Sequence, residues 1–166
     1  HGFNVTSFNP HEAFPSNVRE LYIGSNSESL GQGTNGLNTY AKNVEYVHVD
    51  PNNEYLIGYA GVLYYSKKYT ADDAWKTIDK NVPVYIPAML KSLELLAVDV
   101  PEGGIVYDKE SIKDHNALEE IMFPKETKTI CGYAVEKCPN LKLVYVPQGA
   151  TVESGAFPSN VRIVYM

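Results

Sequence analysis

A short pattern of apolar positions returns along the chain at a constant step. Residues 118–124, Leu-Glu-Glu-Ile-Met-Phe-Pro, place apolar residues at their first, fourth and sixth positions before a proline. The same spacing recurs in residues 141–147 and in residues 95–101, so that Pro101, Pro124 and Pro147 are evenly spaced. Because apolar residues two positions apart lie on one face of a strand, each unit predicts a short strand. The proline has no N–H to offer a sheet and ends the strand.

Without the proline, three further segments fit the same pattern, at residues 18–24, 44–50 and 161–166. The two ends also share a longer sequence, Ala-Phe-Pro-Ser-Asn-Val-Arg, at residues 13–19 and 156–162. A unit of about 23 residues cannot bury its apolar face alone, so the units are predicted to stack into a solenoid with a parallel sheet. The constant step favours this arrangement over an ordinary α/β domain whose strands happen to share a motif.

The segments between the strands are short, and they predict brief helical returns. Ala134, Val135 and Cys138 are spaced to face the core from a helix of one or two turns, and residues 109–116 and 155–157 are comparable. The predicted fold class is therefore α/β, a right-handed β/α superhelix with a short-stranded parallel sheet on its concave face. The chain is predicted to form one domain over residues 1–166.

The regular repeats are predicted at about residues 18–50 and 95–166, with an irregular stretch at about 55–90. In that stretch residues 84–86 are predicted to pair with residues 62–65 in a hairpin outside the regular ladder. Thr70 is predicted to cap a helix that runs to about Asp79.

Composition narrows the classes of partner. The 166 residues are 44% hydrophobic and 20% charged, which is typical of a globular domain. No apolar run approaches the roughly 18 residues of a membrane span, so membrane insertion is not expected. A net charge of −6 offers no basic footprint, so nucleic acid is not an expected partner. Thirteen tyrosines against five phenylalanines are a bias toward an aromatic whose hydroxyl needs a hydrogen-bond partner.

No constellation of residues predicts catalysis, a metal or a cofactor. The four histidines are scattered, and Gly-x-Gly-x-x-Gly at residues 31–36 does not follow a buried strand, so it is predicted to be a return loop. Residues 50–54 carry oxygen donors, yet they lack the spacing of a calcium loop and favour a turn. Cys131 and Cys138 are predicted to be buried thiols rather than a disulfide. The protein is therefore not expected to be an enzyme.

The candidate binding residues come from the strand register. The residue between two inward apolar positions points out of the concave face, next to its counterparts in neighbouring repeats. This row comprises Tyr22, His48, Asp99, Met122, Tyr145 and Tyr165. A second row comprises Glu20, Tyr46, Ala97, Glu120, Leu143 and Ile163. The binding candidates are the first row together with Tyr46. Such amphipathic side chains suit recognition of a protein or glycan; the alternative is that neighbouring aromatics only stabilise the sheet.

Residues 118–124 and 131–141 resemble the BspA-type class of bacterial leucine-rich repeats, in which a strand ending in Ile-Pro precedes a return reading Ile-Gly-x-x-Ala-Phe-x-x-Cys-x-x-Leu. Residues 49–64 resemble a variant unit of that family with a hairpin return. The resemblance covers about residues 18–166, with departures at Val135, which replaces the Phe, and in the long insertion at 66–81. It implies a leucine-rich-repeat solenoid, exported or displayed at the surface of host-associated bacteria, with adhesion as the most frequent role and no catalytic residues.

The expected function is a non-enzymatic, exported or cell-surface binding and adhesion module that recognises a host or bacterial surface protein or glycan through its concave face. The alternative is a structural spacer or assembly subunit of a larger cell-envelope protein. The chain opens at His1 without a signal segment, which we expect to have been removed. It closes on a strand at Met166, and solenoids usually need capped ends, so self-association through an end repeat is also predicted.

Overall fold

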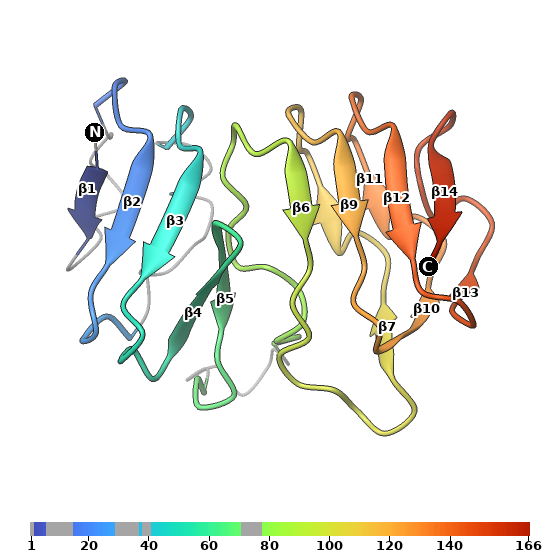
Figure 1. Cartoon of the computed structure of the whole chain (residues 1–166), viewed down its shortest axis with the longest axis horizontal. Coiled ribbons are helices and arrows are strands. Elements are labelled where there is room, and N and C mark those ends of the chain that lie inside the picture. The colour runs from blue at the N-terminus through green and yellow to red at the C-terminus, as the bar shows by residue number, and fades with distance from the viewer. Residues whose placement is uncertain (1, 6–14, 29–36, 38–40, 71–77) are drawn as a thin grey trace. The chain divides into compact units, whose positions relative to one another are not determined.

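The computed structural model describes residues 2–5, 15–28, 37, 41–70 and 78–166, and for residues 2–5 it describes the backbone (Figure 1). The chain forms two compact units, His1–Leu90 and Lys91–Met166, called here the N-terminal and C-terminal units. The predicted loop at residues 31–36 and most of the helix predicted from Thr70 lie outside the described residues.

The C-terminal unit is a parallel β-solenoid whose coils contribute strands to three sheets. The first sheet has the order β14-β12-β9-β6 and comprises β6 (Ser92–Glu94), β9 (Glu120–Met122), β12 (Leu143–Val146) and β14 (Arg162–Tyr165). The second has the order β13-β10-β7 and comprises β7 (Ile105–Tyr107), β10 (Thr127–Ile130) and β13 (Thr151–Val152). The third pairs β8 (Ile112–Lys113) with β11 (Val135–Glu136). Every pairing is parallel, so the predicted stacking of repeats into a solenoid is confirmed.

The helical returns predicted for this unit are wrong, and with them the α/β leucine-rich-repeat superhelix. No residue of Lys91–Met166 is helical. Backbone N–H groups in the returns donate to the next coil, as from Ile112 to Ala134 O (3.0 Å) and from Val135 to Ala156 O (3.0 Å). These donors are therefore not free for hydrogen bonds within a helix. Ala134, Val135 and Cys138 are nevertheless buried, so their inward positions were predicted correctly.

Left-handed corners also exclude helices from the returns. Glu110, Tyr133 and Gly155 occupy corresponding corners of successive coils, and their φ angles are 60°, 61° and 74°. Tyr133 N donates to Gly155 O, and Glu110 N donates to Tyr133 O, which aligns the three corners. A second such row comprises Asp114, Lys137 and Asn160, with φ angles of 59°, 53° and 70°. A right-handed helix cannot pass through a residue in this conformation.

The three evenly spaced prolines occupy equivalent positions in successive coils, as predicted. Gly104, Thr127 and Ala150 each donate a backbone hydrogen bond to the proline three residues earlier, so Pro101, Pro124 and Pro147 open equivalent turns. Ile121 pairs with Val144 of the next repeat, as predicted.

The strand predicted at residues 98–100 is wrong. Ile121 pairs on its other side with Leu93 rather than with Val98, so the true strand is β6. The chain between β6 and Pro101 is therefore longer than the repeat allows, and the extra residues form a bend. They include Val98 and Val100, whose spacing imitates the strand pattern, yet Val100 is exposed.

The final strand is displaced by one residue from its predicted register. Tyr145 pairs with Val164, whereas Tyr165 pairs with Val146. The backbone of Met166 fixes this register, because its N–H donates to Val146 O and its carbonyl accepts from Gln148 N. Tyr165 therefore does not stand beside Tyr145 as predicted. The apolar run Ile163-Val164 allowed either alignment, since both residues can face inward.

The described residues of the N-terminal unit form a parallel sheet and a hairpin. The sheet has the order β1-β2-β3, with β1 (Gly2–Val5), β2 (Glu20–Ile23) and β3 (Tyr46–Val49). The hairpin pairs β4 (Leu56–Tyr59) with β5 (Val62–Tyr65). Leu21 pairs with Val47 and Ile23 with Val49, as the sequence pattern predicts. The predicted pairing of residues 84–86 with this hairpin is reduced to a single bridge between Leu63 and Tyr85.

The tyrosines divide between the interior and the sheet surface. Tyr64, Tyr85 and Tyr107 are among the largest fully buried side chains, whereas Tyr22 and Tyr46 are exposed on one sheet. The two groups therefore serve different purposes, and only the second is open to a partner.

Candidate functional site

Four polar and aromatic side chains gather on the outward face of the sheet in the N-terminal unit. Glu20 and Tyr22 project from β2, and Tyr46 and His48 project from β3, which pairs with it in register. The residues between them, such as Leu21, are buried, so strand alternation sends these four to the opposite side. We call Glu20, Tyr22, Tyr46 and His48 the Tyr–His–Glu cluster. The sequence predicted both of its rows.

The cluster is held by direct contacts. Tyr22 Oη donates to Glu20 Oε2 at 2.6 Å, and His48 Nε2 lies 3.2 Å from the same oxygen. The Tyr22 and His48 rings stack with centroids 4.5 Å apart and planes 8° from parallel. Tyr46 lies against His48 at the same centroid distance, tilted by 38°. The imidazole therefore contacts both tyrosine rings and the carboxylate, and it links all four side chains.

These contacts shape the protonation of the cluster. The hydrogen bond from Tyr22, followed by that from His48, lowers the pKa of the Glu20 carboxyl below its ordinary value. The same hydrogen bond to Glu20 raises the pKa of the Tyr22 phenol. At neutral pH the cluster therefore presents an ionised carboxylate beside a protonated phenol.

The hairpin holds Tyr46 in place from the side. Gly61, at the turn between β4 and β5, accepts a hydrogen bond from Val47 N at 2.9 Å. A Cβ on Gly61 would lie 2.7 Å from the Tyr46 ring, and its φ of 81° disfavours any other residue. The ring of Tyr46 therefore rests on a glycine that the type of turn also requires.

An open depression adjoins the cluster where β2 and β3 end. Its volume is about 470 Å³, and its lining comprises Tyr22, Ile23, Gly24, His48, Val49 and Asp50. Asp50 is anchored by its backbone, whose N–H donates to Ile23 O at 2.9 Å. Asp50 therefore lines the depression together with Tyr22 and His48.

The turn predicted at residues 50–54 is confirmed, and its oxygens are used within the fold. Asp50 Oδ1 accepts from Asn52 N at 2.8 Å. Asn53 Oδ1 accepts from the backbone of Tyr55 and Leu56, and Asn53 Nδ2 donates to Gly24 O. Asn53 is therefore a structural link between the turn and the preceding coil.

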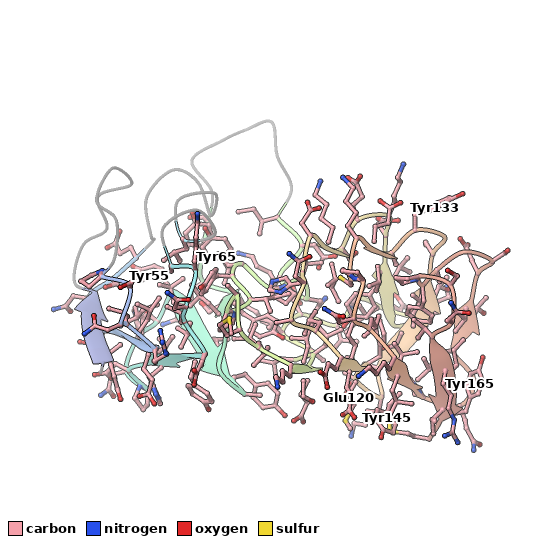
Figure 2. All side chains as sticks on the ribbon, turned by 90° about the horizontal axis from the view of Figure 1, so that it is seen from above. Tyr55, Tyr65, Glu120, Tyr133, Tyr145 and Tyr165 are labelled. Atoms are coloured by element: carbon pink, nitrogen blue, oxygen red, sulfur yellow. The ribbon has the colours of Figure 1, made fainter. Side chains whose placement is uncertain are left out.

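The C-terminal unit presents the equivalent face with different side chains. Its observed rows are Glu94, Met122, Tyr145 and Val164, and Ser92, Glu120, Leu143 and Arg162. Figure 2 shows Glu120 and Tyr145 on one side of this unit and Tyr133 on the other.

The predicted binding residues therefore fall into separate groups. Tyr22, Tyr46 and His48 come together in one unit, and Met122 and Tyr145 are neighbours in the other. Asp99 lies in the bend after β6, so its predicted place beside Met122 belongs to Glu94, and Tyr165 lies outside the row of Tyr145.

Two residues of the site were missed as candidates. Glu20 was placed in the outward row but not among the binding residues, although its position two before Tyr22 puts both on one face. Asp50 was considered only for calcium. The signal that could have found it is its place immediately after the predicted strand, where the outward face ends.

Both cysteines are free thiols. Cys138 is buried as predicted, whereas Cys131 is half-buried, with its Sγ 3.9 Å from Asp108 Oδ1. Desolvation, then the negative charges of Glu153 and Asp108, raise the pKa of Cys131. Burial is also the main cause that raises the pKa of Cys138. Protonated thiols are poor nucleophiles, so neither cysteine has the character of a reactive centre.

Neither a metal-binding group nor similarity to a known protein identifies the role of the chain. Among the described residues, no three histidine, cysteine or acidic side chains are grouped so that they could hold a metal ion. In the same part of the chain no helix has the length and apolar character needed to cross a membrane. No protein-family model, curated protein or solved structure matches the chain.

Proposed function

We propose that this protein is a non-enzymatic binding module and that the outward face of the β1-β2-β3 sheet is its recognition surface. The observation that carries the proposal is the Tyr–His–Glu cluster, in which exposed aromatic side chains are already ordered by stacking and hydrogen bonds. Binding to a surface that is already ordered loses less conformational entropy, so such a surface gains affinity at little cost.

The exposure of the cluster favours recognition over a purely structural role. Tyr22 and Tyr46 leave 42% and 40% of their surface in contact with solvent. The buried face of the same strands, with Leu21 and Val47 at 1% exposure each, accounts for the packing of the sheet. Cross-strand stacking contributes stability as well. It does not by itself require amphipathic rings next to a depression.

The resemblance of the repeats to BspA-type bacterial proteins supports an exported or cell-surface location. On that basis we propose that the partner is a surface protein or a surface glycan. Tyrosine is well suited to either, since it offers a large rigid ring and a hydroxyl.

A combined glycan and matrix-protein array tests the proposal. The wild-type chain is expected to bind a defined subset of the array, and the double variant Tyr22→Ser/Tyr46→Ser is expected to lose that binding. Tyr133→Ser is the matched control, because Tyr133 is 57% exposed and belongs to the C-terminal unit rather than to the cluster. Retained binding by the double variant, with loss in Tyr133→Ser, would show that the surface has been assigned to the wrong face.

A further inference from the structure

One oxygen of the Glu20 carboxylate is directed to the outside of the cluster. Glu20 Oε2 accepts from Tyr22 and approaches His48, whereas Oε1 has no hydrogen-bond partner among the described residues. The Glu20 side chain is 43% exposed. Its neighbour in register on β1 is Gly2, which carries no side chain. An ionised, oriented carboxylate therefore remains available to a partner.

The depression that adjoins the cluster is acidic. Asp50 lines it, and the lining contains no lysine or arginine. Arg19, the nearest basic residue in the sequence, is engaged with Glu45 at 3.6 Å and donates to Ser16 O at 3.0 Å. The whole chain has a net charge of −6. The electrostatic field at this face therefore favours a positively charged ligand.

The aromatic rings point to the same ligand class. Cations are attracted to carboxylates and to tyrosine rings, and the two attractions add where both groups lie together. The face of Tyr22 that His48 covers is closed to a sugar and to a cation alike. The ionised Glu20 carboxylate beside the rings is attractive only to the cation, so the arrangement favours a cation over a neutral sugar.

We propose that the Tyr–His–Glu cluster binds a lysine or arginine side chain carried by an exposed segment of a partner protein. The cationic group pairs with Glu20 Oε1 beside the tyrosine rings, and Asp50 in the depression attracts a second positive charge of the same segment. This inference rests on the proposed function and narrows it to proteins that display basic segments.

The test uses the full chain and three defined probes. They are a short peptide in which arginine alternates with glycine and serine, the same peptide with glutamine in place of arginine, and a neutral hexose oligosaccharide. Binding is followed through the NMR signals of the His48 imidazole. The arginine peptide is expected to shift these signals and the glutamine peptide to leave them unchanged. The affinity should fall as salt is raised, because exposed charges are screened.

Two variants separate a specific contact from overall charge. Glu20→Gln keeps the shape of the side chain. It is expected to lower the affinity for the arginine peptide by about three- to five-fold, which is within the range of an exposed ion pair. Glu102→Gln removes the same charge from an exposed residue of the C-terminal unit and is expected to leave the affinity unchanged. Equal weakening by both variants would overturn the proposal, because the peptide would then respond only to net charge.

The remaining outcomes distinguish this inference from the function on which it rests. Equal binding of the glutamine peptide, or His48 shifts with the oligosaccharide alone, would overturn the cationic ligand while leaving the face as a binding surface. Failure of every peptide, the oligosaccharide and the array to perturb the cluster would overturn both.

Discussion

In the N-terminal unit the outward face of the parallel sheet brings four side chains into contact, whereas the equivalent face of the C-terminal unit carries a mixed row of Glu94, Met122, Tyr145 and Val164. The backbone pairing is the same in kind, since both sheets are parallel and bury every second residue. The sheet therefore supplies equivalent positions, and the side chains at those positions decide whether a site is built there.

The two units also differ in how they close their coils. The C-terminal unit stacks short strands on three sides, with left-handed corners that repeat from coil to coil. The N-terminal unit places an antiparallel hairpin against β3 instead, and the turn of this hairpin supports Tyr46. A departure from the regular repeat thus lies next to the candidate site, which is where structural irregularities are often found.

Truncation of a buried valine on the inward face of either sheet should give the largest loss of stability. The loss should be the same in the two units. Val47 and Val144 are matched in chemistry and are 1% and 0% exposed. Val47→Ala and Val144→Ala are each expected to lower the free energy of unfolding by about 2 kcal/mol, measured by urea denaturation. Val106→Ala, at a 39% exposed position, is the control and should change it by less than about 0.5 kcal/mol. A loss at only one of the buried valines would show that the two inward faces are not equivalent.

Substitution of the left-handed glycine in each unit should give different losses of stability, with the larger loss at Gly61 of the hairpin. Gly61→Ala combines a left-handed φ with a contact of 2.7 Å to the Tyr46 ring, and it is expected to cost about 2 kcal/mol in thermal or urea unfolding. Gly155→Ala shares the left-handed φ but meets no atom within 4 Å, so its cost should be about 1 kcal/mol. A larger loss of stability in Gly155→Ala than in Gly61→Ala would show that the contact between Gly61 and Tyr46 does not contribute to stability.

Loss of an asparagine hydrogen bond that both units contain should lower the stability of each unit by the same amount. Asn43 Nδ2 donates to Ser16 O at 2.9 Å, and Asn140 Nδ2 donates to Asn116 O at 2.6 Å, in each case across to the preceding coil. Asn43→Ala and Asn140→Ala are each expected to lower the free energy of unfolding by about 1 kcal/mol. Asn116→Ala keeps the backbone acceptor and should be nearly neutral. A cost at Asn116 similar to that at Asn140 would contradict this assignment.

The smallest effect concerns protonation of the cluster. The folded pKa of Glu20 is lowered, chiefly by the hydrogen bond from Tyr22, so Glu20 contributes stability above its unfolded pKa and loses it as pH falls through the folded pKa. An NMR titration of the Glu20 carboxyl carbon should therefore give a midpoint below 4.5, the ordinary value. Tyr22→Phe should move the midpoint back up. A midpoint at or above 4.5 in the wild-type chain would show that the hydrogen bond is not formed.

The regular part of this fold could be predicted from the sequence because its signal is local. Alternation places Leu21 inward and Tyr22 outward without knowledge of the rest of the chain, and the prolines mark equivalent turns. The step failed at Asp99 because the extra residues before Pro101 are themselves apolar at the right spacing. It failed at Tyr165 because two adjacent apolar residues fit the pattern in either register.

Features that depend on contacts between coils could not be predicted from single segments. The returns have the composition of short helices, yet their N–H groups donate to the neighbouring coil, as Val135 does to Ala156. The cluster was predicted as rows of side chains, but the convergence of Tyr22 and His48 on one oxygen of Glu20 depends on rotamers and on the support of Gly61. These contacts join residues that are distant in the sequence, so no single segment contains the information that predicts them.

The comparison between the two outward faces is tested most directly by NMR of the chain with ¹³C-labelled tyrosine rings, titrated with the strongest ligand from the combined glycan and matrix-protein array. We expect the ring signals of Tyr22 and Tyr46 to shift with a common affinity, while those of Tyr145 and Tyr165 stay in place. Shifts confined to Tyr145 and Tyr165 would contradict the account, because recognition would then belong to the C-terminal unit.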